Sequence, residues 1–287
     1  MSAFQRLALY GRMVKFSHSV FALPFAMASA TLAAPEGGLA PETLAWIVVA
    51  MVGARSAAMG FNRLADHAID ARNPRTAARE LPAGAMSRGE VWLFVIVSAA
   101  ALVLAAWRLN PLCLALSPVA LFVIFGYSYT KRFTALSHAV LGLGLAIAPV
   151  GAWIAVRGRF DLPPVLLGLA VLAWVAGFDI IYACQDVDFD RGAGLNSIPA
   201  RLGVGGALRV SRALHVAAVL LLASLPAVTA LHVVYLAGVV LVAVMLAYEH
   251  SLVREGDLSR VDAAFFTVNG WIGVLYLAFV LLARWLA

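Results

Sequence analysis

Two groups of acidic residues, far apart in the chain, could together hold a divalent metal ion. The members of both groups recur at helical spacing: Asn62, Asp66 and Asp70 in the first, and Asp179, Asp186 and Asp190 in the second. Carboxylates gathered in one place repel each other unless a cation joins them. Mg²⁺ prefers oxygen ligands, so the two groups predict a magnesium site if the fold brings them together.

Basic residues follow these acids and could bind an anionic substrate. Arg75 and Arg79 follow the first group, and Lys131 ends an apolar stretch one helical turn after Tyr127. Guanidinium and ammonium groups beside metal-binding carboxylates suit a diphosphate, and Tyr127 could donate a hydrogen bond to its bridging oxygen. A belt of aromatic and basic residues at a membrane surface would also explain Tyr127 and Lys131, so both interpretations stay open.

Arg55 lies seven residues before Asn62, two helical turns deeper on the same face. An arginine inside a membrane is costly, and two explanations for it stay open. Either it forms a buried ion pair with one of the aspartates, or its planar fork binds the carboxylate of a second, aromatic substrate. In the second group, Tyr182 shares a face with Asp179 and Asp186 if one helix runs through all three.

Composition places these residues in a helical membrane protein. The chain of 287 residues is 63% hydrophobic and only 13% charged, with a mean hydropathy of +0.92. This is too little charge to cover a soluble domain, and the long continuous apolar runs predict helices rather than a barrel. We expect one domain over residues 1–287 with nine membrane-spanning helices: 16–34, 42–61, 90–107, 111–129, 136–156, 164–183, 208–230, 232–250 and 261–285.

The distribution of positive charge predicts the orientation of the chain. Most of the 21 Lys and Arg residues fall on one side of the membrane if the N-terminus is cytoplasmic. The longest hydrophilic loops, roughly 66–90 and 184–207, then both face the cytoplasm and carry the acidic groups. The net charge of +6 is therefore a topology signal, and we expect no nucleic-acid partner, because no basic arm with interleaved aromatic residues stands outside the membrane.

The other polar and small residues of the spans give weaker signals. Four histidines have no partner at a spacing that indicates a site: His138, His215, His232 and His250. Gly142 and Gly144 are expected where neighbouring helices pack closely, because small residues let helix backbones approach each other.

The same residues resemble the motifs of a known family. The tract Asn62–Asp70, Asn-Arg-Leu-Ala-Asp-His-Ala-Ile-Asp, resembles the first aspartate-rich motif of the UbiA superfamily of intramembrane prenyltransferases. The tract Asp179–Asp190 resembles its second motif, Tyr127–Lys131 resembles its YxxxK element, and Arg75–Gly84 resembles its RTxxRPLPxG loop.

Two positions depart from the pattern of that family. Arg63 follows Asn62 where the family usually has Asp, and Glu80 follows Arg79 where it usually has Pro. Arg63 removes a third acidic ligand from the first motif but leaves the two aspartates one turn apart.

The resemblance implies a fold and a set of site residues. The fold would have nine helices around a central cavity, capped by two cytoplasmic loops, in a bacterial inner membrane. Mg²⁺ would be held by Asp66, Asp70, Asp186 and Asp190. The same four acids would act in catalysis together with Lys131 and Tyr127. Substrate binding would fall to Arg55, Asn62, Arg75, Arg79, Asp179 and Tyr182.

The implied activity is Mg²⁺-dependent transfer of a polyprenyl group from an isoprenoid diphosphate to a carboxylated aromatic acceptor. The acceptor would be 4-hydroxybenzoate or a dihydroxynaphthoate, in the biosynthesis of ubiquinone or menaquinone, with the prenyl tail among the helices and the membrane lipid. Two alternatives stay open. One is prenyl transfer to haem, chlorophyllide or a phosphosugar on the same scaffold, and the other is membrane transport of anionic or divalent solutes.

Overall fold

The computed structural model describes residues 3–14 and 21–287, and helices account for most of them. The helices have the following bounds: α1 Ala3–Met13, α2 Leu23–Ala33, α3 Pro41–Asp70, α4 Arg88–Leu109, α5 Pro111–Thr130, α6 Ser137–Arg157, α7 Leu162–Ala183, α8 Val187–Gly192, α9 Ile198–Ser224, α10 Val234–Ser251 and α11 Asn269–Trp285. A 3₁₀ turn, Cys184–Asp186, joins α7 to α8, a second, Leu225–Ala227, follows α9, and a π-helix, Ala263–Val268, leads into α11.

Within residues 3–14 and 21–287, eight segments are long and apolar enough to cross a membrane: Pro41–Asp70, Arg88–Leu109, Pro111–Thr130, Ser137–Arg157, Leu162–Gly192, Ile198–Ala227, Val234–Ser251 and Ala263–Trp285. They correspond to eight of the predicted spans and confirm an all-α, multi-pass membrane protein. The predicted span 16–34 corresponds to the short apolar helix α2, but residues 15–20 lie outside the described part of the chain. The count of nine spans and the single domain therefore stay predictions.

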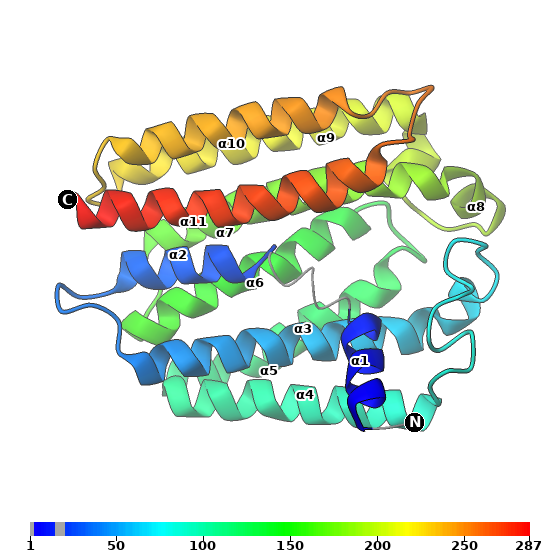
Figure 1. Cartoon of the computed structure of the whole chain (residues 1–287), viewed down its shortest axis with the longest axis horizontal. Helices are drawn as coiled ribbons and strands as arrows, with labels where there is room; N and C mark the ends of the chain where they lie inside the picture. The colour runs from blue at the N-terminus through cyan, green and yellow to red at the C-terminus, as the bar shows by residue number, and fades with distance from the viewer. Residues whose placement is uncertain (1–2, 15–20) are drawn as a thin grey trace.

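Successive long helices run in opposite directions, which brings two distant loops to one end of the bundle (Figure 1). Residues 71–87, which follow α3, and residues 184–197, which include α8, both lie at this end, called the loop end below. The C-terminus lies at the opposite end. Asn73 and Arg75 of the first loop both donate hydrogen bonds to Asp186 of the second, so the loops are in direct contact.

α7 lies at the centre of the bundle because it buries apolar residues on several of its sides. Val171, Val175, Ile180 and Ile181 are all fully buried, whereas a surface helix would bury only one stripe of its residues. The neighbours of α7 are chiefly α6 and α9. The central helix therefore sets the positions of both.

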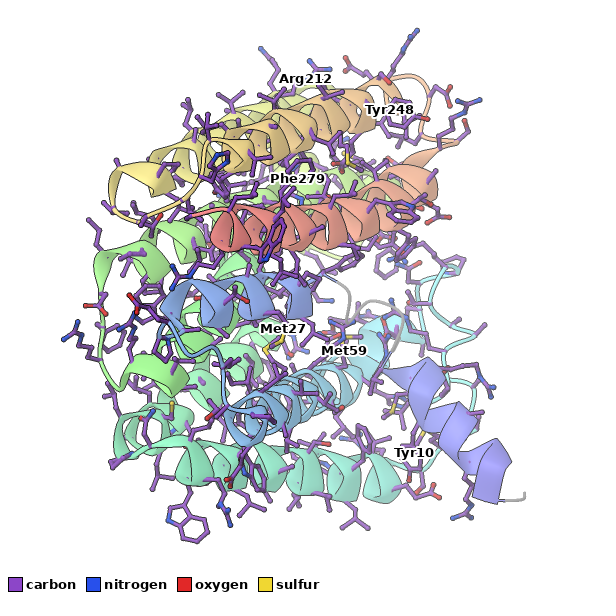
Figure 2. The ribbon with its side chains drawn as sticks, turned by 60° about the vertical axis from the view of Figure 1, so that its left-hand side comes forward. Tyr10, Met27, Met59, Arg212, Tyr248 and Phe279 are labelled. Carbon is purple, nitrogen blue, oxygen red and sulfur yellow. The ribbon has the colours of Figure 1, made fainter. Side chains whose placement is uncertain are left out.

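The outer surface of the bundle is also apolar, as expected for a protein surrounded by lipid. Phe122 and Leu220 are 78% and 65% exposed. Figure 2 shows Met27 of α2 and Met59 of α3 in the interior, between the two sides of the bundle, whereas Tyr248 of α10 lies on its outer surface.

The N-terminal helix α1 packs across the loop end of α3 and α4 (Figure 1). Tyr10 stacks on Phe94 of α4, with ring centroids 5.0 Å apart. Leu9 and Met13 are buried in the same apolar cluster as Leu81 of the first loop. α1 therefore supports the loop that carries Arg75 and Arg79.

Gly142 allows a close approach of α6 to α7. A Cβ atom at this position would overlap the carbonyl oxygen of Leu172, which is backbone and cannot turn away. At Gly144 the nearest heavy atom to such a Cβ atom is Ile124 Cγ2 at 3.8 Å, an ordinary contact. The expected helix contact is thus confirmed for Gly142, whereas Gly144 has room for a methyl group.

We expect Gly142→Ala to destabilise the protein by about 1–3 kcal/mol, because the added methyl group forces the two helices apart. Gly144→Ala is the matched control and should unfold close to the parent temperature. Thermal unfolding of both purified variants in one detergent checks this. Equal unfolding temperatures for the two variants would show that the contact between α6 and α7 is not close.

Candidate active site

The two acidic groups meet at the loop end. α3 continues unbroken to Asp70, so Asn62, Asp66 and Asp70 lie on one helical face, as the spacing predicts. The second group does not lie on one continuous helix, because α7 ends at Ala183 and a 3₁₀ turn carries Asp186 before α8 begins. That turn directs Asp186 towards the loop that follows α3.

Three of the four predicted metal ligands each pair with a cation from the predicted diphosphate-binding set. Lys131 Nζ lies 2.6 Å from Asp66 Oδ2, and Arg79 Nη1 lies 2.8 Å from both oxygens of Asp70. Asp66 and Asp70 are buried, whereas Lys131 and Arg79 remain partly exposed. Losing one partner of such a pair is costly, because it leaves a buried charge uncompensated.

The third pair crosses between the two loops. Arg75 donates to both oxygens of Asp186, with Nε 2.9 Å from Oδ1, and Asn73 Nδ2 donates to the same Oδ1 at 3.1 Å. Burial alone would lower the pKa of Arg75, but the hydrogen bond and negative charge of Asp186 outweigh it and raise this pKa above its ordinary value. Arg75 therefore stays charged at all physiological pH values.

Asp190, the fourth predicted ligand, lies on α8 and interacts with the Ser197 side chain. Ser197 caps α9 by accepting a hydrogen bond from Ala200 N at 3.2 Å. The backbone N–H of Asn196 donates to Lys131 O at 2.7 Å, so this loop also contacts the end of α5. Asp188 is exposed, as expected from its position off the shared face.

The donor chemistry fits Mg²⁺, although the acids do not converge on one point. In the described part of the chain, no three His, Cys, Asp or Glu side chains are grouped closely enough to hold a metal ion. Asp66 Oδ1 is nevertheless buried without a hydrogen-bond partner among the described residues, and Arg132 Nη2 lies 3.6 Å from it. An unused buried carboxylate oxygen is suited to a hard cation. The ligand set assigned from the sequence stays a prediction.

A long cavity opens beneath this mouth. Its volume is about 690 Å³, and its polar lining at the loop end includes Asn62, Arg79, Tyr127, Asp179 and Tyr182. From there it continues along α3 as far as Ile47, a rise of about 22 Å along that helix. The lining of this deeper part is almost wholly apolar, so the cavity suits a molecule with an anionic head and a long hydrocarbon tail.

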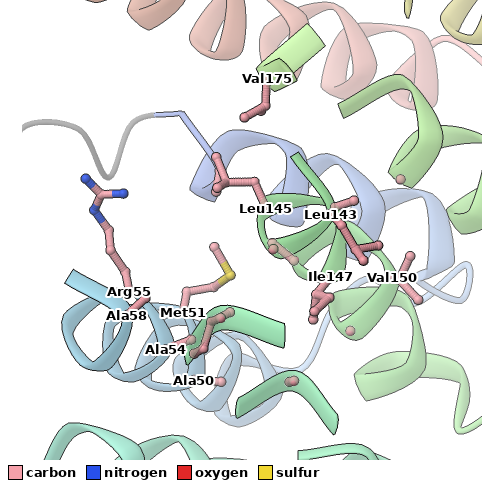
Figure 3. A pocket seen from close by; sticks show the side chains of 18 of the residues that line it. Ala50, Met51, Ala54, Arg55, Ala58, Leu143, Leu145, Ile147, Val150 and Val175 are labelled. Carbon is pink, nitrogen blue, oxygen red and sulfur yellow. The ribbon is translucent and has the colours of Figure 1, made fainter. Parts of the chain in front are cut away.

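Arg55 is the charged residue of the predicted site that lies deepest along α3. It lines the cavity, and Figure 3 shows its side chain extending from α3 beyond the short side chains of Ala54 and Ala58. Leu145 and Val175 face α3 across the cavity (Figure 3). Arg55 therefore lies within an apolar lining, at the depth predicted from its spacing of seven residues from Asn62.

Asn62 and Tyr182 are both held by neighbouring elements. Asn62 Nδ2 lies 3.1 Å from Asp66 Oδ2 and 3.4 Å from Ser128 Oγ of α5. The Tyr182 hydroxyl accepts a hydrogen bond from Arg75 Nη1 at 3.2 Å, and its ring packs on Phe265 with centroids 4.2 Å apart. Both side chains are therefore positioned before any substrate contacts them.

Arg63, at a position where the resemblance leads us to expect Asp, is buried and lines the cavity. Its Nη2 lies 3.5 Å from the carbonyl oxygen of Met13, at the C-terminal end of α1. A guanidinium at a helix C-terminus is favourable, because the last carbonyl groups carry partial negative charge. Arg63 thus links α1 to the helix that carries the first acidic group.

Two residues of the site could not be found from the sequence. The sequence spacing gives no sign of a partner for His138, but its Nδ1 lies 2.7 Å from Asp179 Oδ2, across 41 residues of chain. Asn73, which bonds to Asp186, had a weak local signal, because Asn side chains often accept from the backbone two residues on, as Asn73 does from Arg75 N at 3.0 Å. The pairing of His138 with Asp179 has no such local signal.

A second buried polar cluster lies in the C-terminal half, behind the aromatic lining. Asn269 is fully buried and accepts a hydrogen bond from Trp174 Nε1 at 2.7 Å. Its Nδ2 donates to Glu249 Oε1 at 3.0 Å and to the carbonyl oxygens of Ala264 and Phe265 in the π-helix. A π-helix is rare, and here the Asn269 amide satisfies carbonyl groups that this geometry frees.

A helical bundle with an acidic, cation-paired mouth above a long apolar cavity defines a membrane protein suited to anionic amphiphiles. Residues 22–285 match the UbiA prenyltransferase family, and the chain belongs to this family.

Similar proteins agree with this assignment. Two relatives are named 4-hydroxybenzoate octaprenyltransferase. The chain is 32% identical to the one from Tolumonas auensis, over 80% of this chain and 79% of that protein. It is 30% identical to the one from Vibrio cholerae, over 89% of each chain. The solved apo structure of a UbiA homologue from Aeropyrum pernix K1 has 36% identity and a TM-score of 0.84, over 92% of this chain and 97% of that one. A UbiA homologue from Archaeoglobus fulgidus, bound to GPP and Mg²⁺, shares the fold at 21% identity, with a TM-score of 0.77 over 96% and 99% of the two chains.

We expect Asn269→Leu to lower the stability of the protein substantially. It leaves Trp174 Nε1 and the π-helix carbonyl groups without their partner, and each such buried group costs about 1–3 kcal/mol. Glu249→Gln is the control, because its amide oxygen can still accept from Asn269. Thermal unfolding should rank parent, Glu249→Gln and Asn269→Leu in descending order; a reversed order of the two variants would contradict the role of Asn269.

Proposed function

We propose that this chain transfers a polyprenyl group from an isoprenoid diphosphate to a carboxylated aromatic acceptor, in respiratory quinone biosynthesis. The observation that carries the proposal is the mouth of the cavity, where three acids pair with three cations directly above a long apolar space. The names of the similar proteins support 4-hydroxybenzoate as the acceptor. The Archaeoglobus fulgidus structure supports a diphosphate and Mg²⁺ as ligands of this fold.

The donor would bind by an exchange of ionic partners. Lys131, Arg75 and Arg79 would each leave a carboxylate for oxygens of the diphosphate. Mg²⁺, held by Asp66, Asp70, Asp186 and Asp190, would supply positive charge that stabilises the departing diphosphate. The exchange keeps every buried charge compensated, which avoids the cost of an isolated one.

The cavity would protect the reactive allylic group from water. Its apolar lining excludes solvent from the carbon that loses the diphosphate. Tyr127, Phe178, Tyr182 and Phe265 line the cavity, and their rings would stabilise the developing positive charge. Tyr127, one turn before Lys131, would donate a hydrogen bond to the oxygen that leaves.

The acceptor would enter with its carboxylate on Arg55. A planar guanidinium binds a carboxylate through two parallel hydrogen bonds, and Arg55 lines the cavity below the mouth. Asn62, two turns further along the same face of α3, would contact the same molecule near the diphosphate end.

The loop end would face the cytoplasm, where soluble acceptor and donor head groups are available. The arginines of the loops 71–87 and 184–197 support this orientation. The protein would then lie in the bacterial inner membrane with its N-terminus and active-site loops on the cytoplasmic side.

We expect Asp66→Ala and Asp186→Ala to abolish Mg²⁺-dependent prenyl transfer to 4-hydroxybenzoate. Each change removes a predicted metal ligand and leaves Lys131 or Arg75 without its carboxylate. Asp188→Ala is the matched control, since Asp188 is exposed beside the same turn. Labelled product extracted from membranes, with and without Mg²⁺, is the measurement. Full activity of Asp66→Ala or Asp186→Ala would exclude a metal-binding role for that residue. Solute flux in liposomes that contain no isoprenoid diphosphate would favour transport instead.

We expect Arg55→Leu to raise the KM for the aromatic acid about 10–100-fold, which is the affinity lost when a hydrogen bond between charged groups is removed. The KM for the prenyl donor should stay unchanged. Arg72→Leu, an exposed arginine at the loop end, is the control. Steady-state kinetics with each substrate varied in turn separates the two effects. An equal rise in both KM values would assign Arg55 to the structure rather than to the acceptor.

A further inference from the structure

The pairing of His138 with Asp179 differs in kind from the other acid–base pairs of the site. His138 Nδ1 lies 2.7 Å from Asp179 Oδ2, and His138 Nε2 lies 3.4 Å from the backbone nitrogen of Ile198. A backbone N–H can only donate, so Nε2 must accept, and the ring proton must be on Nδ1, facing Asp179. The imidazole is therefore held as the neutral tautomer that donates to the carboxylate.

This arrangement gives Asp179 a partner that carries no permanent charge. Asp66, Asp70 and Asp186 pair with lysine or arginine, which carry permanent charge. Among the described residues, Asp179 instead receives one hydrogen bond, from the His138 ring. A carboxylate oriented in this way keeps its capacity to accept a proton, which a carboxylate bound to a permanent cation largely loses.

Asp179 also has access to the substrate, whereas His138 does not. Asp179 lines the cavity, with 19% of its side chain exposed, and the His138 side chain is 5% exposed behind it. His138 is the second residue of α6 and Ile198 is the first residue of α9, so the imidazole is fixed between two helices. It can orient Asp179 but cannot reach a molecule in the cavity itself.

Charge would turn the acceptor so that its reacting edge faces Asp179. Arg55 and Asp179 line the same cavity from α3 and α7. An aromatic acid would place its carboxylate on Arg55 and away from the negative Asp179. The edge of the ring opposite the carboxylate, which bears the hydroxyl group and the reacting carbon, then lies towards Asp179.

Resting on the proposed function, we propose that Asp179 is the base that accepts the proton lost from the aromatic ring, and that His138 is its positioning residue. The C1–O bond of the donor breaks, and its electron pair leaves with the diphosphate. A pair of ring π electrons forms the bond from the ring carbon to C1. The C–H bond at that carbon then breaks, its electrons restore aromaticity, and the proton moves to a carboxylate oxygen of Asp179.

The test uses the full-length protein with Mg²⁺, a prenyl diphosphate and 4-hydroxybenzoate, either unlabelled or deuterated at the ring positions next to the hydroxyl group. Asp179→Asn keeps the shape of the side chain but removes the base, and should reduce kcat by about 10²–10⁴-fold. Because proton loss then becomes slow, a primary deuterium isotope effect larger than that of the parent should appear on kcat.

His138 is tested by one disruptive and one conservative variant. His138→Phe removes the donor and should lower kcat with the same rise in isotope effect, at an unchanged KM for the prenyl diphosphate. His138→Asn places an amide N–H near the position of Nδ1 and should recover most of the lost kcat. His232→Phe, at an exposed histidine, is the matched control and should behave as the parent does.

The outcomes separate this inference from the proposed function. A parent that forms no prenylated 4-hydroxybenzoate would overturn both. An active parent, together with Asp179→Asn at parental kcat or with no increase in isotope effect, would overturn the assignment of the base alone. A His138→Asn variant as slow as His138→Phe would show that the imidazole has a structural role only.

Discussion

The site depends on the matching of opposite charges between elements that are distant in the chain. Lys131 at the end of α5 pairs with Asp66 of α3, and Arg75 of the first loop pairs with Asp186 beyond α7. Neither pair adds much net stability, because burying Asp66 costs its desolvation and the pair of Arg75 with Asp186 is partly exposed and screened by solvent. The pairs therefore act mainly as geometric constraints, which hold α3, α5 and the two loops in one arrangement.

The length of α3 explains why charged groups can lie at the loop end of this membrane helix. The helix has 30 residues and extends about 45 Å, whereas the hydrocarbon core of a bilayer is roughly 30 Å thick. Its last turns, with Asp66 and Asp70, therefore project beyond the hydrocarbon to the level of the lipid head groups. The apolar part of the same helix carries Arg55 and the wall of the cavity.

Much of this arrangement follows from the periodicity of the sequence, and the remainder does not. The spans are predictable because an apolar run of a given length has few alternatives in a membrane, and the common face of Asn62, Asp66 and Asp70 requires only that α3 continue. The 3₁₀ turn at Asp186 has no comparable signal, since no Gly or Pro marks the end of α7. His138 and Asn269 find partners on other helices, and such pairings depend on how the helices pack rather than on spacing within one helix.

The wall of the cavity has a consequence for the length of the hydrocarbon that it admits. The cavity is only partly enclosed, and Val119, Leu143 and Leu169, which line it, are 56%, 43% and 45% exposed. A cavity that is closed at its far end would limit the length of the hydrocarbon tail that it can hold. A cavity whose side is open to the bilayer sets no such limit, because the remaining methylene groups of the tail can extend among the acyl chains of neighbouring lipids.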